Sequence, residues 1–265
     1  MQSFRSSSGT VHFRASTVRE GRKTLVFINS LGTDLRIWDG VVEVLADQFN
    51  VMRYDKRGHG LSDGSSGPVK ISDYTEDIRE LLQHLKVGKV IPVGLSVGGL
   101  IAQALYKSQP DMIEALILSN TAVRIGTVES WNSRIASVRA KGMVSILDAV
   151  MERWFSPDFR TQRKGEFALY RNMLERADVN GYVSCCEAIR DADYTADAAK
   201  IAVPALCIVG DHDGATPPDL VKATASLIPR SQMEVIPGAA HLPCVEKPET
   251  YAGILVRFIA ERVSA

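Results

Sequence analysis

A glycine-rich turn between an apolar run and a helical run is the feature that most constrains this chain. Residues 94–99 read GLSVGG; they follow the apolar run 90–93 and precede a helix-forming run that begins at Leu100. Small residues around a serine let a strand and a helix meet in a sharp, strained turn that lifts the hydroxyl clear of a sheet. The pattern predicts Ser96 as a nucleophile. Such turns also occur without catalysis, so the prediction depends on partners elsewhere in the chain.

Two downstream segments contain the partners that a nucleophilic serine needs. A serine hydroxyl reacts poorly until a histidine accepts its proton and a carboxylate fixes the tautomer of that histidine. The apolar run 203–210 is followed directly by Asp211 and Asp213, and the run 233–236 is followed by a loop that contains His241. Carboxyl ends of parallel strands are where such sheets place their active sites. Spacing alone does not separate Asp211 from Asp213.

The other four histidines suit the role of general base less well. His12 and His84 fall in peripheral segments, and His59 lies in an Arg-Gly-His-Gly loop. His212 is adjacent to both candidate acids and is too close to them in sequence to reach the serine easily. His241 is therefore the predicted base.

Four segments together resemble the α/β-hydrolase-fold serine hydrolases over essentially the whole chain. They are GLSVGG at 94–99, GDHDGATPP at 210–218, PGAAH at 237–241 and YDKRGHGLSD at 54–63, the last similar to the Asp-x-Arg-Gly-x-Gly-x-Ser segment after the family's fourth strand. The family's Gly-x-x-Asp pattern falls on Asp213. The resemblance thus implies a catalytic triad of Ser96, Asp213 and His241. Asp211 is then expected to be a turn residue that caps its own loop.

Acyl transfer also requires backbone N–H groups aimed at the oxyanion that forms during attack. Val97, directly after the nucleophile, supplies one in this family. Alignment on Trp38 assigns the other to Leu31, in a stretch that reads Asn-Ser-Leu-Gly at 29–32 where most relatives have His-Gly. This stretch is similar to that of the 3-oxoadipate enol-lactonases, so the resemblance narrows to that subgroup.

The chain alternates strand-like and helical segments, which implies an α/β fold with a mostly parallel twisted sheet flanked by helices. The predicted strands are 10–17, 24–28, 51–54, 90–93, 115–118, 205–209 and 233–236. A helix is predicted over 73–86, with Asp73 and Glu76 in a capping pattern. Pro92 conflicts with its central strand because it removes a backbone donor, so that strand is either short or bent there.

Residues 121–200 interrupt this alternation and contain helical patterns without a convincing strand. One such pattern comprises Met143, Ile146, Leu147, Val150 and Met151. An insertion after the sixth strand resembles the helical cap of many family members, which excludes water and selects the substrate. We therefore expect a hydrolase core of residues 1–120 and 201–265 and a cap of residues 121–200.

The cap is expected to supply the substrate-binding residues. Trp131 and Arg134 are three apart and share a helix face, and a planar guanidinium is the usual partner of a carboxylate. Tryptophans in thin helical layers are more often core, however, and arginines on helices are mostly solvated. Several cap segments again resemble the enol-lactonases. The candidate substrate-binding residues are Trp131, Arg134, Arg124, Arg153, Trp154 and Tyr182.

The resemblance implies hydrolysis of a carboxylated enol-lactone, 3-oxoadipate enol-lactone, to 3-oxoadipate in aromatic degradation, with no cofactor and no metal. A broad carboxylesterase or a cofactor-free perhydrolase of the haloperoxidase type would share the same triad. A receptor-like binding protein with slow turnover is a further alternative. Dehalogenases and epoxide hydrolases are disfavoured because they have Asp at the position of Ser96.

Composition fits this interpretation without deciding it. The 265 residues, 45% of them hydrophobic, are enough for one α/β core with an insertion, and 31 acidic residues balance 31 basic ones. We expect no nucleic-acid or membrane partner. We expect a soluble, cytoplasmic enzyme that acts on a small molecule, and the sequence leaves open whether it forms a homo-oligomer. Cys185 and Cys186 are adjacent, which predicts reduced, packed thiols rather than disulfides or a zinc site.

Overall fold

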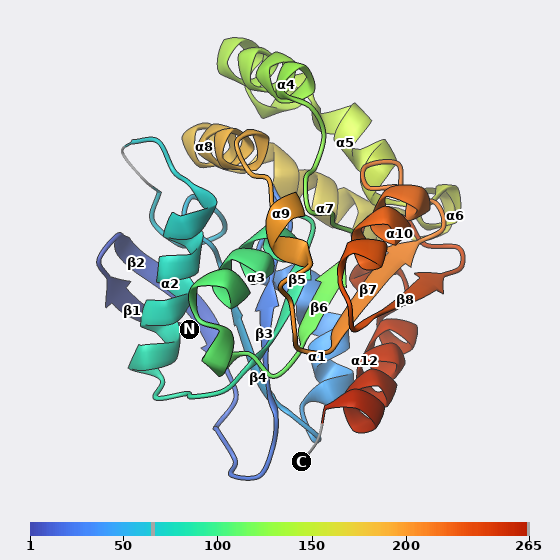
Figure 1. Ribbon diagram of the computed structural model, residues 1–265. Helices are drawn as coiled ribbons and strands as arrows, with labels where there is room; N and C mark the ends of the chain where they lie inside the picture. The colour runs from blue at the N-terminus through green and yellow to red at the C-terminus, as the bar shows by residue number, and fades with distance from the viewer. Residues whose placement is uncertain (65–66, 264–265) are drawn as a thin grey trace.

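One mixed β-sheet organises the molecule. In the computed structural model, which describes residues 1–64 and 67–263, this sheet has eight strands in the order β1-β2-β4-β3-β5-β6-β7-β8 (Figure 1). The strands are β1 Gln2–Ser6, β2 Gly9–Ala15, β3 Thr24–Ile28, β4 Asn50–Tyr54, β5 Ile91–Leu95, β6 Leu116–Ser119, β7 Ala205–Gly210 and β8 Ser231–Ile236. The β1–β2 and β2–β4 pairs are antiparallel, and every later pair is parallel. The predicted α/β-hydrolase fold is confirmed.

The central strands form where the sequence has short continuous apolar runs. All residues of β3, β5, β6 and β7 are buried, as expected for parallel strands covered by helices on both faces. β1 was not predicted, because its sequence QSFRS is polar and only Phe4 and Ser6 are buried. It is an edge strand that pairs with β2 alone.

Helices flank the sheet and fill the segment between β6 and β7. Helices α2 and α3 pack together, as do α1 and α12. The helices of the core are α1 Asp39–Leu45, α2 Ile71–His84, α3 Val97–Ser108, α10 Pro218–Leu227, α11 Pro243–Glu246 and α12 Pro248–Arg262, with 3₁₀ turns η1 Leu35–Trp38 and η2 Pro110–Met112. No helix in the described part of the chain is long and apolar enough to cross a bilayer.

The helices inserted between β6 and β7 lie mostly above the ends toward which the parallel strands point, and only the last, short one lies lower, against α3 (Figure 1). They are α4 Val128–Lys141, α5 Leu147–Trp154, α6 Pro157–Gln162, α7 Lys164–Glu175, α8 Val179–Arg190 and α9 Thr195–Ala198. The apolar pattern predicted over 143–151 is split between the 3₁₀ turn η3 Met143–Ser145 and α5. The separation of residues 121–200 as a cap domain stays a prediction.

Two local predictions need correction or refinement. Helix α2 begins at Ile71 rather than Asp73, because the Asp73 carboxylate accepts a hydrogen bond from the Lys70 backbone N–H at 2.7 Å. Glu76 does not cap the helix; it pairs with Arg79 on its exposed side. Pro92 lies in β5, but there the strand pairs only with β3, and its ladder with β6 starts at Val93.

The turn between β5 and α3 is as tight as its glycines suggest. Ser96 has φ 58° and ψ −116°, a left-handed conformation that is unfavourable for a residue with a side chain. A Cβ atom on Gly94 would lie 2.2 Å from the Gly98 carbonyl oxygen, and one on Gly98 would lie 2.2 Å from the Ile28 carbonyl oxygen. The close approach of backbones therefore excludes any side chain at either position.

Replacing Gly98 by alanine should therefore destabilise the fold. We expect Gly98→Ala to lower the free energy of unfolding by about 1–3 kcal/mol or more, since the new methyl group collides with rigid backbone of β3. Gly253→Ala, in the middle of α12 with no atom within 4 Å of the new methyl group, should be more stable than wild type by about 1 kcal/mol. Urea unfolding of both variants measures the contrast. Equal effects would refute the close approach at Gly98.

Candidate active site

A cavity of about 570 Å³ lies between the carboxyl edge of the sheet and the inserted helices. Its lower wall, on the side of the sheet, includes the loops after β3, β5, β7 and β8, and its upper wall, on the side of the inserted helices, includes α4, α5 and α8. Most of the residues singled out in the sequence line it, namely Leu31, Ser96, Trp131, Arg134, Arg153, Trp154, Tyr182 and His241.

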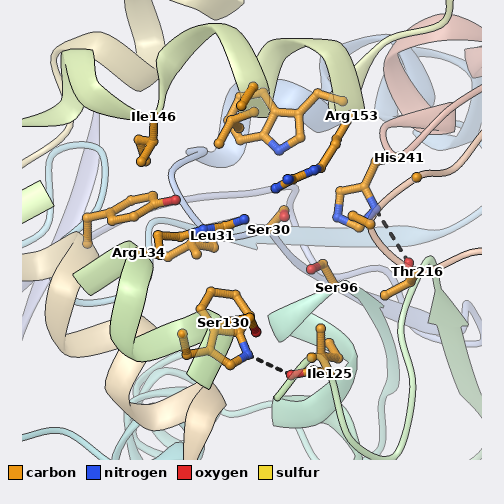
Figure 2. Close-up of a pocket in the computed structure, with 18 of the residues that line it drawn as sticks. Ser30, Leu31, Ser96, Ile125, Ser130, Arg134, Ile146, Arg153, Thr216 and His241 are labelled. Atoms are coloured by element: carbon orange, nitrogen blue, oxygen red, sulfur yellow. Dashed lines mark hydrogen bonds between the residues drawn. The ribbon is translucent and has the colours of Figure 1, made fainter. Parts of the chain in front are cut away.

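Ser96 stands at the start of α3 with its hydroxyl in this cavity (Figure 2). Its backbone is fixed on both sides: the N–H donates to the Ser119 carbonyl at 2.9 Å, and the carbonyl accepts from the Thr121 hydroxyl at 2.7 Å. The hydroxyl itself makes no hydrogen bond within the described residues. It is therefore free to meet a ligand, and the hydrogen bond to His241 that catalysis requires would have to form when one binds.

His241 and Asp213 form a buried hydrogen-bonded pair. Nδ1 of His241 lies 2.9 Å from Oδ2 and 3.1 Å from Oδ1 of Asp213, and both side chains are almost fully buried. The Thr216 hydroxyl lies 3.5 Å from the same ring nitrogen (Figure 2). A carboxylate on Nδ1 fixes the proton there and leaves Nε2 as the basic nitrogen.

The Asp213 carboxylate accepts hydrogen bonds from several fixed donors besides the histidine. They are the backbone N–H groups of Ala215 at 2.8 Å and Thr216 at 3.1 Å, the Thr216 hydroxyl at 2.7 Å and the Asn120 amide at 2.8 Å. Burial alone would raise the pKa of Asp213, but the charge of His241 and these hydrogen bonds outweigh it and lower the pKa to about 2. The group is thus an anion at any ordinary pH.

Asn120 is a part of this network that the sequence did not reveal. It follows β6 in a left-handed conformation (φ 47°), and its amide bridges Asp213 and the Ala240 carbonyl at 3.2 Å. The Ser119 hydroxyl donates to its side-chain oxygen at 2.9 Å, which fixes the orientation of the amide. The only signal in the sequence was its place at the carboxyl end of a predicted strand.

Asp211 has a different role from the one expected. Its carboxylate accepts hydrogen bonds from the backbone N–H groups of Gly238 at 2.8 Å and Ala239 at 3.3 Å. It therefore caps the neighbouring loop after β8 rather than its own loop. That loop leads to His241, so Asp211 supports the histidine only through backbone.

Glu246 ties the histidine loop to the inserted helices, which the sequence also did not show. One carboxylate oxygen accepts from the Ala240 N–H at 2.7 Å, and the other accepts from the Ser156 hydroxyl at 2.5 Å. Burial raises the pKa of Glu246, against the opposing effect of these hydrogen bonds. In addition, the Leu242 N–H donates to the Trp154 carbonyl at 3.2 Å. The position of His241 is thereby coupled to α5 and α6.

The loop after β3 presents an unused backbone donor to the cavity. The Asn29 amide binds the Thr33 carbonyl and so closes this loop on itself. The backbone N–H of Leu31 donates to no atom of the described residues. Val97 is the first residue of α3, where an N–H has no acceptor in a preceding turn. These are the two groups predicted to bind an oxyanion.

The upper wall combines aromatic rings with guanidinium groups. The Arg134 guanidinium carbon lies 4.9 Å from the centroid of the Trp131 ring, and the Trp131 indole N–H donates to the Ile125 carbonyl at 2.6 Å. Arg153 extends into the cavity from α5 (Figure 2). Burial raises the pKa of Tyr182, opposed by the positive charge of Arg134, so the phenol stays neutral.

Arg124 is the one predicted substrate-binding residue that does not line the cavity. It is exposed in the segment before α4, and its guanidinium lies 3.8 Å from Asp193. The next residue, Ile125, is buried and lines the cavity, whereas the side chain of Arg124 is exposed to solvent.

Comparisons with known proteins agree with this geometry. A family model described as serine aminopeptidase, S33 (Hydrolase_4) matches residues 19–248. The chain is 34% identical to 3-oxoadipate enol-lactonase 2 of Acinetobacter baylyi over 230 residues, which cover 87% of this chain and 86% of that protein. The chain belongs to this α/β-hydrolase family. It is accordingly a hydrolase of ester bonds.

Two solved structures are similar to this α/β hydrolase over nearly the whole chain. The enol-lactonase from Burkholderia xenovorans LB400 is 36% identical and superposes with a TM-score of 0.93, covering 98% of this chain and 100% of its own. A thermophilic esterase from Thermogutta terrifontis, solved with malate bound, is 26% identical with a TM-score of 0.92 and full coverage of both chains (100% each).

The contrast between the two aspartates generates a prediction. Asp213→Asn should lower kcat by about 10⁴-fold, because an amide at this place permits the wrong tautomer of His241. Asp211→Asn should have a much smaller effect, since an amide oxygen can still accept from the Gly238 N–H. Steady-state kinetics of both variants on any ester that the wild-type enzyme hydrolyses measure the two effects. A reversed order of the two effects would move the acid of the site to Asp211.

Proposed function

We propose that this α/β hydrolase opens a carboxylated enol-lactone, most specifically 3-oxoadipate enol-lactone, through an acyl-enzyme on Ser96. The observation on which this substrate rests is the pair of guanidinium groups, Arg134 and Arg153, in a cavity that also contains the Ser96 hydroxyl. Neither guanidinium pairs with a carboxylate of the described residues.

Most other arginines of residues 121–200 differ in this respect. Five of them form ion pairs with carboxylates of the protein, namely Arg124, Arg139, Arg163, Arg171 and Arg190. Arg160 and Arg176 also form no ion pair in the described structure, but they do not line the cavity. The two that line the cavity therefore have their charge available for a ligand. A planar guanidinium binds a carboxylate through two parallel hydrogen bonds, so these residues favour an anionic substrate over a neutral one.

Acylation would begin with attack of the Ser96 oxygen on the ring carbonyl. Nε2 of His241 accepts the hydroxyl proton, and the Asp213 anion stabilises the resulting imidazolium. The tetrahedral intermediate places a negative oxygen near the N–H groups of Leu31 and Val97, and the start of α3 adds its dipole. The ring C–O bond then breaks, and the enolate oxygen takes the proton from His241.

Deacylation would use the same groups a second time. The released enol tautomerises to a ketone, which removes the ring oxygen as a competing nucleophile. Water, deprotonated by His241, attacks the acyl-enzyme, and the Ser96 oxygen leaves with the proton that His241 returns. The products are one open-chain keto acid with two carboxylates and the regenerated enzyme. Apart from the substrate and water, these steps use only residues of this chain.

The inserted helices would act as the cap over this chemistry. They supply Trp131, Trp154 and Tyr182 to the upper wall, and these rings reduce the access of water to the acyl-enzyme. The names of the similar Acinetobacter and Burkholderia proteins support the same substrate class.

A broad carboxylesterase is the second candidate. Apolar side chains such as Ile146 and Val150 also line the cavity, and the similar Thermogutta protein is an esterase. A neutral ester would use the same nucleophile but would leave both guanidinium groups without an anionic partner. The preference between anionic and neutral substrates therefore separates the two candidates.

The nucleophile can be tested by labelling. Ser96→Ala should lose about three to six orders of magnitude in turnover while folding normally. A fluorophosphonate should add once to the wild-type protein, at Ser96, and should also label Ser108→Ala, which removes a serine at the far end of the same helix. Intact-protein mass spectrometry with peptide mapping gives the site. An adduct elsewhere, or near-normal activity of Ser96→Ala, would remove Ser96 from this role.

The substrate carboxylate can be tested through Arg134. Loss of a buried charge partner costs about 2–5 kcal/mol, so Arg134→Ala should reduce kcat/KM for the lactone accordingly and should affect a neutral ester far less. Arg139→Ala is the matched control: it lies on the same helix, pairs with Glu187 at 2.7 Å and does not line the cavity. Equal losses on both substrates would mean that Arg134 supports only the packing of α4.

A further inference from the structure

Lys56 is a fully buried lysine beside the loop that contains Leu31. It follows β4, which neighbours β3 in the sheet, and its side chain has no exposed surface. Its ammonium nitrogen donates to the Ser30 carbonyl at 2.5 Å. Within the described residues it forms no ion pair: the nearby Asp55 carboxylate binds His12 at 2.7 Å and backbone N–H groups of two other residues.

The Ser30 carbonyl and the Leu31 N–H belong to the same peptide unit. The carbonyl also accepts from the Thr33 hydroxyl at 2.9 Å and from the Thr33 N–H at 3.3 Å. In a trans peptide the C=O and N–H bonds point in opposite directions, and the structure contains no cis peptide among its described residues. Three donors that hold the carbonyl on the Lys56 side therefore leave the Leu31 N–H facing the other way. Both Ser30 and Leu31 line the cavity with Ser96.

A positively charged donor on a carbonyl also changes the strength of the N–H on the same peptide. Hydrogen bonds in a chain polarise one another, and a charged donor does so more than a neutral one. We propose that Lys56 is a positioning residue that orients and polarises the Ser30–Leu31 peptide and thereby strengthens the Leu31 N–H as a donor to the oxyanion. This inference rests on the proposed function only in that Ser96 is the nucleophile; it does not depend on which acyl substrate is used.

We expect the charge of Lys56 to add little to the stability of the fold. A buried ammonium loses its hydration, and replacing a buried charged group by an apolar one of similar size is often neutral or stabilising. Met has nearly the same length as Lys and could fill the same space. If Lys56 only filled space, its replacement by Met would therefore leave turnover unchanged.

The groups around Lys56 make its charge sensitive to pH. Burial lowers the pKa of Lys56 to about 8, against the opposing electrostatic effects of Cys185 on α8, Asp55 and Asp34. Burial raises the pKa of the Cys185 thiol, and burial together with the charge of Lys56 lowers the pKa of His59 well below its usual value. The thiol and the imidazole are therefore neutral near pH 8, and the ammonium is the group of this cluster that changes charge there.

The two consequences of this titration have opposite signs. The ammonium is present below about pH 8 and is lost above it, so acylation should slow as the pH rises through 8. The pKa of the folded state is lower than the ordinary value of 10.5, so the unfolded state binds more protons between these values and stability should rise over the same range. A fall in rate with a gain in stability is not expected from simple alkaline unfolding.

The experiment compares Lys56→Met with wild type on a neutral activated ester, p-nitrophenyl acetate, from pH 6.5 to 9.5. We expect Lys56→Met to lower the acylation rate about tenfold to a hundredfold at pH 7, somewhat less than the 10²–10³ caused by removal of a whole oxyanion donor. KM should stay within about twofold, resistance to urea should be equal or higher, and the alkaline decline of the wild type should disappear. Thr33→Val, which removes a neutral donor from the same carbonyl, should keep that decline.

Several results would overturn the proposal. They are a wild-type rate that does not fall between pH 7 and 9.5, a Lys56→Met rate equal to wild type, or a Lys56→Met variant that keeps the alkaline decline. If Lys56→Met does not fold, Lys56→Gln takes its place in the comparison. The pH profile of the wild-type rate tests the proposal without any variant. If the enzyme does not hydrolyse the enol-lactone but shows the expected pH profile on p-nitrophenyl acetate, only the substrate of the proposed function is refuted. Full acylation of Ser96→Ala would refute the nucleophile and this inference together.

Discussion

The left-handed backbone at Ser96 is the constraint on which the rest of the site depends. A non-glycine residue in an unfavourable backbone conformation costs about 1–3 kcal/mol, and it persists only where its surroundings hold it. Here the Ser119 carbonyl and the Thr121 hydroxyl hold the peptide groups of Ser96, and Gly98 lies against the Ile28 carbonyl. Three neighbouring strands, β3, β5 and β6, therefore meet at one turn. This arrangement fixes where the hydroxyl points.

Parallel strand order then brings the remaining groups to the same edge. β6, β7 and β8 are adjacent in the sheet, and the loops that follow them contain Asn120, Asp213 and His241 in that order. Fixed donors around Asp213 keep it ionised, and Asp213 in turn orients His241. On the other side of Ser96, the loop after β3 is fastened by Lys56 from the loop after β4. The inserted helices join this edge through Glu246 and Ser156.

The sequence predicted the parts that local patterns encode. Apolar runs located seven of the strands, and the glycines around Ser96 located the turn, because these depend on neighbouring residues. Asn120 lies 93 positions from Asp213 and Lys56 lies 26 positions from Ser30, so their contacts depend on strand order, which local patterns do not give. Arg124 and Arg134 were both candidates in the sequence, Arg134 favoured by its spacing from Trp131; Arg124 pairs with Asp193 at the surface, and Arg134 lines the cavity. The free cysteines were predicted as reduced and packed, and all four are buried thiols.

The central claim is that this hydrolase acts on an enol-lactone whose carboxylate binds the guanidinium groups of the cavity. The most direct test compares kcat/KM for 3-oxoadipate enol-lactone with that for the same lactone bearing a carboxamide in place of its carboxylate. A charge partner worth about 2–5 kcal/mol predicts a preference for the carboxylate of at least about 30-fold. Equal rates, or faster turnover of the carboxamide, would contradict the account and favour a carboxylesterase.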